Sequence, residues 1–349
     1  MRAVTTKSTM RARLLNGQTG DPAILVSLRW QGRAFLLDLG RIDHTPAATL
    51  FPVEAVFVSH AHMDHFMGFD RLLRLFLTRD TTLRLYGPAG IADHVQGKLA
   101  GYTWNLTDEY VFTIDVTEIA AAEMRTSRFA ARRRFEREAV GGPVPFSGVV
   151  FSDPVVTVEA APLDHKIVSM AYAVTERAHL NVRDGALEAA GLAPGPWLNV
   201  LKQAVRSAAD DDTPITVAPG DRRPLAALRD ALLDVTPGQK IAYVVDTLFS
   251  PANARKIVAL AADADVFFCE SPFLEEDLEQ ASRRYHLTAG QAGALGRAAG
   301  VRRLQTFHFS PRYEGRYGDL VAEAQAEFAG QKVHYAELDR GSAAVSRGA

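Results

Sequence analysis

Residues 59–65 hold three of the ten histidines of the chain together with one aspartate. The apolar run in front of this segment, residues 53–59, is rich in valine, which indicates a strand. The residues behind it, 69–77, repeat apolar side chains with the period of an amphipathic helix. The histidine cluster therefore lies in a polar loop between a strand and a helix.

This loop has the side chains and the spacing of a metal site. Alternate side chains of an extended segment point the same way, so His60 and His62 can reach one ion. The turn that follows brings Asp64 and His65 towards a neighbouring position. Neutral imidazoles and carboxylates are the ligands of catalytic zinc, which keeps one coordination position open for water. The spacing favours a metal site over a solvated loop in front of a helix.

Strand-like runs alternate with helical patterns along the rest of the chain, which predicts a layered α/β architecture. The further expected strands are residues 23–29, 33–38, 83–86, 155–160, 170–174, 241–245, 266–269 and 304–308, and the further expected helices are 91–100, 252–261, 288–299 and 319–328. Two stretches interrupt this alternation. Residues 125–137 contain six arginines, and residues 185–224 mix glycine and proline with three consecutive aspartates at 210–212.

The composition excludes several classes of protein. With 47% hydrophobic and 23% charged residues the chain can bury a large core, which excludes disorder. Its 39 basic and 41 acidic residues leave a net charge of −2, so it could bind nucleic acid only through a local patch. The single cysteine, Cys269, excludes internal disulfides and thiolate-rich metal sites. Because it lies in an apolar run, we expect a buried, unreactive thiol.

The sequence carries no sign of a membrane or export segment. Residues 1–10 lack the apolar run of a signal peptide, and no later stretch has the length needed to span a bilayer. We expect a cytoplasmic protein that does not contact membranes. Its first ten residues are expected to form a disordered leader, and residues 11–349 a single hydrolase domain.

The His-x-His-x-Asp-His segment is the signature of the metallo-β-lactamase fold, and more of the chain resembles one branch of it, the ribonuclease Z family of tRNA 3′-processing phosphodiesterases. Five further segments carry this resemblance, in the family's order: residues 162–165, 243–247, 270–273, 285–288 and 306–313. The resemblance implies an α/β fold, the αββα sandwich, with an inserted arm or lid. Residues 125–143 would be an arginine-rich insertion, and residues 180–235 a reduced form of the arm.

The resemblance also implies a centre of two zinc ions, although manganese or iron would suit the same ligands. The implied ligands are His60, His62 and His165 for one ion, Asp64, His65 and His308 for the other, and Asp246 as a bridge. Two such cations lower the pKa of a shared water to near neutrality. They also neutralise the charge that builds on a phosphodiester during in-line attack.

Three residues take catalytic roles by the same resemblance. Asp64 would orient or deprotonate the attacking water, besides binding metal. His286 precedes a predicted helix N-terminus and would stabilise the transition state or protonate the leaving oxygen. Glu270 would hold the ring of His286. A polar residue that caps a helix is the alternative interpretation of His286.

The segment after His308 offers candidate phosphate contacts. Ser310, Arg312 and Tyr313 resemble the family's Ser-x-Arg-Tyr, and a guanidinium offers paired donors to phosphate oxygens. A surface charge is the alternative interpretation of Arg312.

The resemblance weakens in the regions that would hold a large RNA. The family's arm is rich in glycine and lysine, whereas here three aspartates and no lysine cluster follow. Of the family's N-terminal loop, only Asp38 and Gly40 remain. On a helix, Arg125, Arg128 and Arg132 would form a row that could contact RNA phosphates instead. A solvated face whose arginines pair with nearby glutamates explains the same row equally well.

The sequence thus predicts a binuclear-zinc phosphodiesterase, with endonucleolytic processing of precursor tRNA as the first hypothesis. A phosphodiesterase for a small molecule or a cyclic nucleotide is the alternative, favoured by the near-neutral charge and the altered arm. A binding scaffold without activity is the third hypothesis, and the full ligand set argues against it. Glu270 with His286 argues against a thioester or lactam substrate. The resemblance further implies a homodimer.

Overall fold

The computed structural model describes residues 10–29, 31–177, 179–236, 238–332, 334, 335 and 338. Of the expected leader, residues 1–9 lie outside the described range, and Met10 is already the first residue of a strand. The described chain divides into two compact units. The first contains the described residues up to 150, then 159–173 and those from 241 on, and the second contains 151–158 and 174–240.

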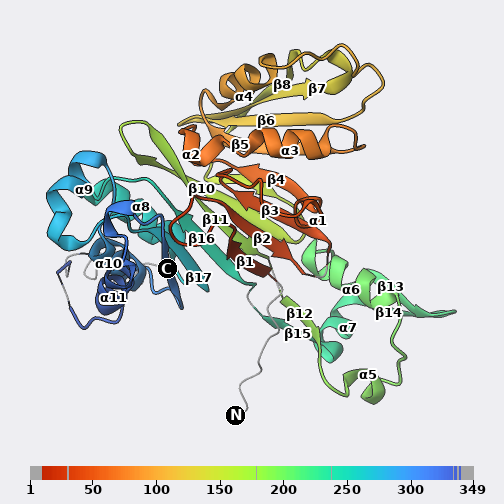
Figure 1. Ribbon diagram of the computed structural model, residues 1–349. Coiled ribbons are helices and arrows are strands. Elements are labelled where there is room, and N and C mark those ends of the chain that lie inside the picture. The colour runs from red at the N-terminus through yellow and green to blue at the C-terminus, as the bar shows by residue number, and fades with distance from the viewer. Residues whose placement is uncertain are drawn as a thin grey trace. The chain divides into compact units, whose positions relative to one another are not determined.

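Two sheets hold most of the strands (Figure 1). The eight-stranded sheet follows the order of the chain: β1 (Met10–Leu14), β2 (Ile24–Leu28), β3 (Arg33–Leu37), β4 (Val53–Phe57), β5 (Thr82–Pro88), β6 (Thr113–Ile119), β7 (Glu123–Ala130) and β8 (Arg137–Pro145). The six-stranded sheet has the order β18 (Leu304–Phe307), β17 (Val266–Glu270), β16 (Lys240–Val244), β11 (Val168–Glu176), β10 (Val156–Asp164) and β9 (Val149–Ser152). These strands include those expected from the sequence.

Each sheet contains a run of parallel strands, β3 to β6 in one and β16 to β18 in the other. Parallel neighbours need crossover connections, which are mostly helical here. The helices of the first unit are α1 (Ala47–Leu50), α2 (Met63–Phe66), α3 (Phe69–Phe76), α4 (Ile91–Ala100), α8 (Pro251–Ala261), α9 (Leu278–Arg284), α10 (Ala289–Ala298) and α11 (Tyr317–Phe328), with 3-10 turns η1 (Ala131–Arg133), η2 (Glu275–Asp277) and η3 (Pro311–Tyr313).

The two sheets of the first unit pack face to face through aromatic side chains. The ring of Phe57 on β4 lies 5.5 Å from the ring of Tyr172 on β11, measured between centroids. The hydroxyl of Tyr172 donates to the carbonyl of Val58 at 2.7 Å, so this buried polar group is satisfied. These contacts hold the end of β4, which precedes the histidine loop, against the second sheet.

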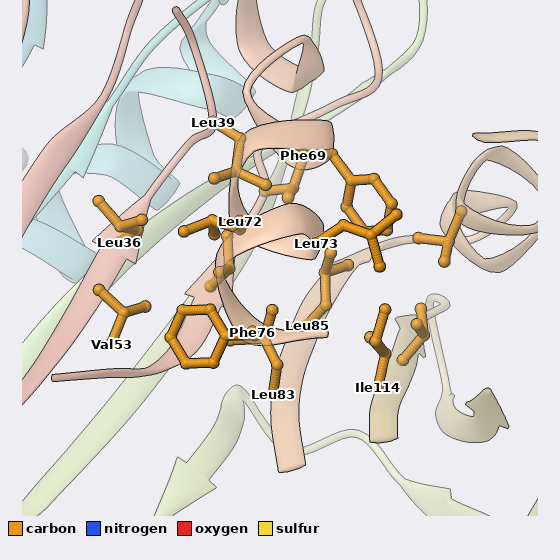
Figure 2. Close-up of a cluster of buried hydrophobic side chains, with 14 of the residues drawn as sticks. Leu36, Leu39, Val53, Phe69, Leu72, Leu73, Phe76, Leu83, Leu85 and Ile114 are labelled. Atoms are coloured by element: carbon orange, nitrogen blue, oxygen red, sulfur yellow. The ribbon is translucent and has the colours of Figure 1, made fainter. Parts of the chain in front are cut away.

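Helix α3 covers the outer face of the eight-stranded sheet (Figure 2). Its buried residues Phe69, Leu72, Leu73 and Phe76 have the i, i+3, i+4, i+7 spacing of one helix face. They pack against strand side chains that include Leu36, Val53, Leu83, Leu85 and Ile114. Burying one such side chain stabilises the fold by roughly 1.5–3 kcal/mol, so this face fixes the helix that follows the histidine loop.

Helices α8, α10 and α11 cover the outer face of the six-stranded sheet. Ile257 of α8, Leu295 of α10 and Leu320 of α11 are buried in one cluster with Phe267 of β17 and Leu304 of β18. Helices therefore lie on both outer faces of two packed sheets. This is the αββα order that the sequence predicts.

The arginine-rich stretch is not a helix, contrary to the row expected from Arg125, Arg128 and Arg132. It forms β7, η1 and the start of β8, the last two strands of the eight-stranded sheet. Phe129 and β-branched neighbours pair β7 with β6, so strand packing overrides the helical spacing. In a strand, residues three apart point to opposite faces, so the expected row does not form.

Five of the six arginines of the arginine hairpin, defined as residues 123–145, are paired with carboxylates. The pairs are Arg125 with Glu123 at 2.6 Å, Arg128 with Asp115 at 2.7 Å, Arg133 with Glu138 at 2.6 Å, Arg134 with Asp108 at 4.0 Å and Arg137 with Glu118 at 2.8 Å. This outcome agrees with the solvated, paired face rather than with an RNA-binding row.

The second unit has its own small core. Trp197, Leu201, Leu228 and Leu232 are buried together there. Its elements are β12 (His179–Val182), α5 (Ala186–Ala189), α6 (Trp197–Arg206), β13 (Pro214–Ala218), β14 (Asp221–Pro224), α7 (Leu225–Leu232) and β15 (Leu233–Thr236). The acidic run within it is partly neutralised, since Asp211 pairs with Arg229 at 2.6 Å.

Candidate metal centre

The first unit gathers its polar side chains where its strands end. Strand β4 is followed by the loop that carries His60 and His62, and α2 begins at Met63. The remaining predicted site residues follow other strands: His165 comes after β10, Asp246 after β16, and His308 after β18, while Glu270 is the last residue of β17. Carboxyl ends of parallel strands are where open α/β sheets commonly place ligands.

One group of candidate ligands consists of His60, His62, His165 and Asp246, whose ligand atoms all lie within 4.8 Å of one another. The Nε2 atom of His165 lies 3.3 Å from Oδ2 of Asp246, and that of His60 lies 3.6 Å from the same oxygen. His62 is the exposed member, while the other three are buried. An ion held there would face solvent on the side of His62.

A second group consists of Asp64, His65 and His308. Oδ2 of Asp64 lies 3.4 Å from Nε2 of His65 and 3.5 Å from Nε2 of His308. Asp246 belongs beside this group too, because its Oδ1 lies 3.0 Å from Nδ1 of His308 and its Oδ2 lies 3.5 Å from Nε2 of His65. The structure thus brings all seven predicted ligands together, with Asp246 between the two groups.

The polar atoms of these groups are placed to bind a metal rather than to form hydrogen bonds with one another. Nε2 of His60, Nε2 of His65, Nδ1 of His308 and Oδ1 of Asp246 are buried without a hydrogen-bond partner in the described structure. An orphaned buried polar atom costs about 1–3 kcal/mol unless something else satisfies it. Two ligands bound at 2.0–2.1 Å in a tetrahedron lie about 3.3 Å apart, close to several of the separations found here. The cluster therefore implies a divalent metal.

A buried carboxylate behind the ligands orients His65. Asp38 lies at the end of β3, and its Oδ2 is 2.7 Å from Nδ1 of His65. The same carboxylate accepts hydrogen bonds from the backbone and hydroxyl of Ser59, at 2.6 and 2.7 Å, and from the hydroxyl of Tyr243 at 2.6 Å. Such a partner fixes which ring nitrogen of a histidine faces the metal. Sequence reasoning assigned Asp38 no role, although a carboxylate that directly follows a buried strand is a usable signal.

The loops that carry His165 and Asp246 are joined by Asn253 at the start of α8. Its side-chain amide donates to the carbonyl of Asp164 at 3.2 Å and to the hydroxyl of Thr247 at 3.0 Å. The ring of His165 is held separately, because its Nδ1 lies 2.7 Å from the carbonyl oxygen of Tyr285. That contact leaves Nε2 of His165 free to face the ion. No sequence pattern singled out Asn253.

The close approach of two loops requires a glycine at position 68. Gly68 donates its N–H to the carbonyl of Leu39 at 2.8 Å, and Leu39 donates to the carbonyl of His65 at 2.9 Å. A Cβ atom at position 68 would overlap the carbonyl oxygen of Gly40. The absence of a side chain at Gly68 therefore lets the loop after Asp38 lie against the turn that carries His65.

Three residues at the centre have left-handed backbone conformations. The φ angles are 60° at Asp38, 45° at Asp246 and 61° at His308. Such a conformation costs a non-glycine residue about 1–3 kcal/mol and persists where the surrounding structure enforces it. Here all three lie just beyond a strand end and turn their side chains into the cluster.

The electrostatics keep two of the ligands, His60 and Asp64, in the forms that bind metal. Burial and the neighbouring ring of His65 lower the pKa of His60 to about 2, so its imidazole is neutral. Burial acts against ionisation of Asp64, yet its contacts with His308 and His65 lower the pKa of this carboxyl below its usual value. Neutral imidazoles and ionised carboxylates are the ligand forms that a divalent ion requires.

His286 and Glu270 form a pair at the edge of the cluster. Nδ1 of His286 lies 2.8 Å from Oε2 of Glu270, which is fully buried. Burial alone would lower the pKa of His286 and raise that of Glu270. The charges of the pair outweigh burial, so the carboxylate raises the pKa of His286, and His286 lowers the pKa of Glu270. Glu270 also accepts the backbone N–H of Thr247 at 2.9 Å, which ties the pair to the loop of Asp246. The cap of α10 is Thr288, not His286.

The three expected phosphate contacts have different surroundings. Tyr313 is buried, and its hydroxyl is bonded to Asp277, so the structure corrects its expected place at the substrate. Ser310 caps η3 by accepting the backbone N–H of Arg312. The guanidinium of Arg312 lies over the ring of Phe273 and 3.3 Å from Asp277. With about a third of its side chain exposed, Arg312 remains the candidate among the three.

A cavity of about 670 Å³ opens beside the first ligand group. His60 and His62 line one side, and the remaining walls are mainly apolar, including Ile91, Ile119 and Met170. His94 also lines it. A cavity of this size accommodates a group as large as a nucleotide.

The described residues also bear on Cys269 and on the helices. Cys269 is fully buried, as predicted, and burial raises the pKa of its thiol well above the ordinary value. No helix in the described part of the chain has the length and apolar character needed to cross a membrane.

Comparison with known proteins places the chain among metal-dependent hydrolases. A family model described as a beta-lactamase superfamily domain matches residues 36–166. Ribonuclease Z of Deinococcus radiodurans is 32% identical over 326 residues, which cover 91% of this chain and 96% of that protein. Ribonuclease BN of Cronobacter sakazakii is 32% identical over 287 residues, covering 80% of this chain and 79% of that protein.

A solved structure shows the same fold. The metallo-beta-lactamase fold protein YhfI from Bacillus subtilis superposes with a TM-score of 0.52 at 14% identity, over 92% of this chain and 93% of that one. This likeness confirms the metallo-β-lactamase fold that the histidine loop predicts.

Proposed function

This chain belongs to the ribonuclease Z family of metal-dependent hydrolases, and we propose that it is an endoribonuclease that processes the 3′ ends of precursor tRNA. One observation carries the proposal: Asp246 lies between two groups of candidate ligands, four of whose atoms are buried without a hydrogen-bond partner in the described structure, on a chain that aligns with ribonuclease Z over nearly its whole length. We propose zinc as the metal, supported by nitrogen and oxygen ligands at tetrahedral spacing.

The proposed ligands are those expected from the sequence. His60, His62 and His165 would hold one ion, and Asp64, His65 and His308 would hold the other, with Asp246 close to both groups. Two ions held there supply a water that is ionised near neutral pH and a positive environment for the phosphodiester. Asp38 keeps His65 in the tautomer whose Nε2 faces the ion.

Two side chains of the site move protons in the proposed reaction. One oxygen of Asp64 faces His65 and His308, and the carboxylate is 44% exposed, which leaves it able to accept the proton of an attacking water. Glu270 holds Nδ1 of His286 and raises its pKa, so the imidazolium form persists to higher pH. Nε2 of His286 is then the donor to the leaving oxygen.

The setting of the reaction is part of the proposal. We propose the cytoplasmic location expected from the sequence and the homodimer that the resemblance implies. The RNA substrate and the buried single thiol are consistent with a reducing compartment. Arg312 is proposed to contact phosphate from its place over Phe273.

The test compares three substrates with one preparation. Zinc-loaded protein is incubated with a 3′-extended precursor tRNA, with bis(p-nitrophenyl) phosphate and with cyclic AMP. Cleavage of the RNA at one position near the mature 3′ end is expected, and a His62→Ala, Asp64→Ala variant should lose it. Turnover of cyclic AMP without cleavage of the RNA would instead assign the site to small phosphodiesters. Manganese- or iron-loaded protein with higher activity would overturn the choice of zinc.

A further inference from the structure

Four arginines of the first unit surround an open cavity of about 640 Å³ outside the metal centre. They are Arg11 and Arg13 on β1, Arg29 after β2, and Arg303 directly before β18. All four are exposed, and none of the described residues that line the cavity is a carboxylate. Within the described part of the chain, none of the four side chains has an ion pair or a hydrogen bond, unlike that of neighbouring Arg302, which pairs with Asp265 at 3.1 Å.

We propose that this arginine pocket binds the phosphate backbone of the RNA substrate. The inference rests on the proposed function and names the surface that holds the substrate. Guanidinium groups offer paired donors that match phosphate oxygens, and each phosphate that is neutralised releases counterions. The pocket gives a chain of net charge −2 the local basic patch that RNA binding requires.

The backbone of β1 presents two of the arginines together. Arg11 and Arg13 are alternate residues of a strand, so their side chains lie on the same face. β1 is an edge strand of the eight-stranded sheet, and β18 is an edge strand of the six-stranded sheet. The pocket therefore lies where two sheet edges of the first unit meet, and both edges contribute basic side chains.

Strand β18 and the contacts of Gln18 link the pocket to the metal centre. Strand β18 follows Arg303 and leads to His308, so about 16 Å of extended chain separates the two residues. Gln18, which lines the pocket, donates its side-chain amide to the carbonyl of Thr306 at 2.9 Å, and its own carbonyl accepts the N–H of Phe309 at 3.0 Å. A polymer with regularly spaced phosphates can occupy the pocket and the centre at once. This geometry favours the substrate's own backbone over another polyanion.

The experiment removes the four charges and measures binding and cleavage separately. The zinc-loaded variant with Arg11→Gln, Arg13→Gln, Arg29→Gln and Arg303→Gln is compared with wild type. A matched variant loses four charges from the arginine hairpin: Arg125→Gln, Arg132→Gln, Arg133→Gln and Arg134→Gln. Binding of a labelled 3′-extended precursor tRNA is followed by fluorescence anisotropy over a salt series, and turnover of bis(p-nitrophenyl) phosphate reports folding and metal loading.

We expect the pocket variant to weaken RNA binding at least tenfold while small-ester turnover stays at the wild-type rate. The slope of log K against log salt should fall by about 0.7–0.9 for each phosphate contact that is lost. The hairpin variant should keep both the affinity and the slope. Equal losses in the two variants would overturn the inference, since they would reflect net charge alone.

Two further outcomes separate this inference from the proposed function. Wild-type protein that cleaves the RNA, together with a pocket variant of unchanged affinity and slope, would overturn the arginine pocket and leave the function standing. Wild-type protein that binds the RNA through the four arginines without cleaving it would support the pocket and overturn the function. Loss of binding to phosphatidylserine vesicles, with RNA binding intact, would assign the pocket to a membrane surface and overturn the inference.

Discussion

The metal centre and the arginine hairpin both concentrate ionisable side chains, but the two regions differ in how far these side chains are paired with one another. In the hairpin five of the six arginines have a carboxylate partner, such as Arg128 with Asp115 on the neighbouring strand. In the metal centre, buried atoms such as Nε2 of His60 and Oδ1 of Asp246 have no hydrogen-bond partner within the described chain. The charges of the hairpin are largely neutralised within the protein, whereas the polar atoms of the metal centre require a bound ligand.

This contrast shows why arginine content alone is a poor guide to RNA binding. Six arginines within residues 125–137 stand out in the sequence, yet five of them are neutralised. The four arginines of the arginine pocket are scattered along the chain and remain unpaired among the described residues. Exposed ion pairs contribute little to stability and leave little charge for a ligand.

Among the substitutions considered, Asp246→Ala in the metal centre should cause the largest loss of activity. Asp246 belongs to the first ligand group and lies beside the second, so its loss affects both proposed ions. A general acid contributes at most about 10⁴-fold, and we expect cleavage of RNA and of the small ester to fall by more than that. Bound zinc, measured by mass spectrometry, should fall below two ions per chain. The exposed control Asp80→Asn should change neither value. Retention of two ions at near wild-type activity would refute the bridging role.

The substitution His286→Ala should lower turnover without removing metal. We expect kcat to fall about 10²–10⁴-fold, because the leaving oxygen loses its proton donor while the proposed ligands stay in place. Glu270→Gln should show a smaller loss, since the ring keeps a hydrogen-bond partner but loses the charge that raises its pKa. A drop in zinc content equal to the drop in kcat would show that His286 acts as a ligand instead.

The substitution Asp38→Asn tests the layer behind the ligands. Partners of this kind typically contribute 10- to 100-fold to metal affinity, so we expect zinc binding to weaken by about that factor. Excess zinc should restore most of the activity. Tyr243→Phe, which removes one of the hydrogen bonds to the same carboxylate, should cost less. Competition with a chelator of known affinity measures the zinc affinity of both variants. Equal losses of affinity would show that the charge of Asp38 is not what supports zinc binding.

The substitution Arg128→Gln in the arginine hairpin should have the smallest effect. The side chain of Arg128 is 43% exposed, so loss of the pair with Asp115 should lower the free energy of unfolding by no more than about 1 kcal/mol. RNA cleavage should not change. Urea unfolding gives the first quantity and the initial rate on precursor tRNA gives the second. A clear rise in KM would mean that paired arginines also serve the substrate.

The fold could be predicted, and the proposed ligands could be singled out, because both depend on local sequence. The loop at 59–65 combines a buried strand, alternating histidines and a helix start, and each of these has its own signal. The long helices were placed to within about two residues, since α3, α8, α10 and α11 each carry an apolar face. The αββα order follows from that alternation.

The parts that were missed depend on contacts between distant segments. Asp38 and Tyr243 are 205 residues apart and meet only in the folded chain. Tyr313 reads as a phosphate contact beside Arg312, yet the fold buries it against Asp277. The strand pairing of β7 with β6 and β8 overrides the helical spacing of its arginines. The arginine pocket joins residues almost 300 positions apart, which no local pattern reveals.

Because Cys269 is buried, the protein is suited to site-specific labelling at introduced cysteines. Its only thiol is fully buried with a raised pKa, so a maleimide has no accessible native target in the folded protein. A single introduced cysteine, such as Arg132→Cys in the hairpin or Gly17→Cys at the rim of the arginine pocket, would carry one label at a known position. Crosslinking from these two sites to a thiolated RNA would trace the path of the substrate over the surface.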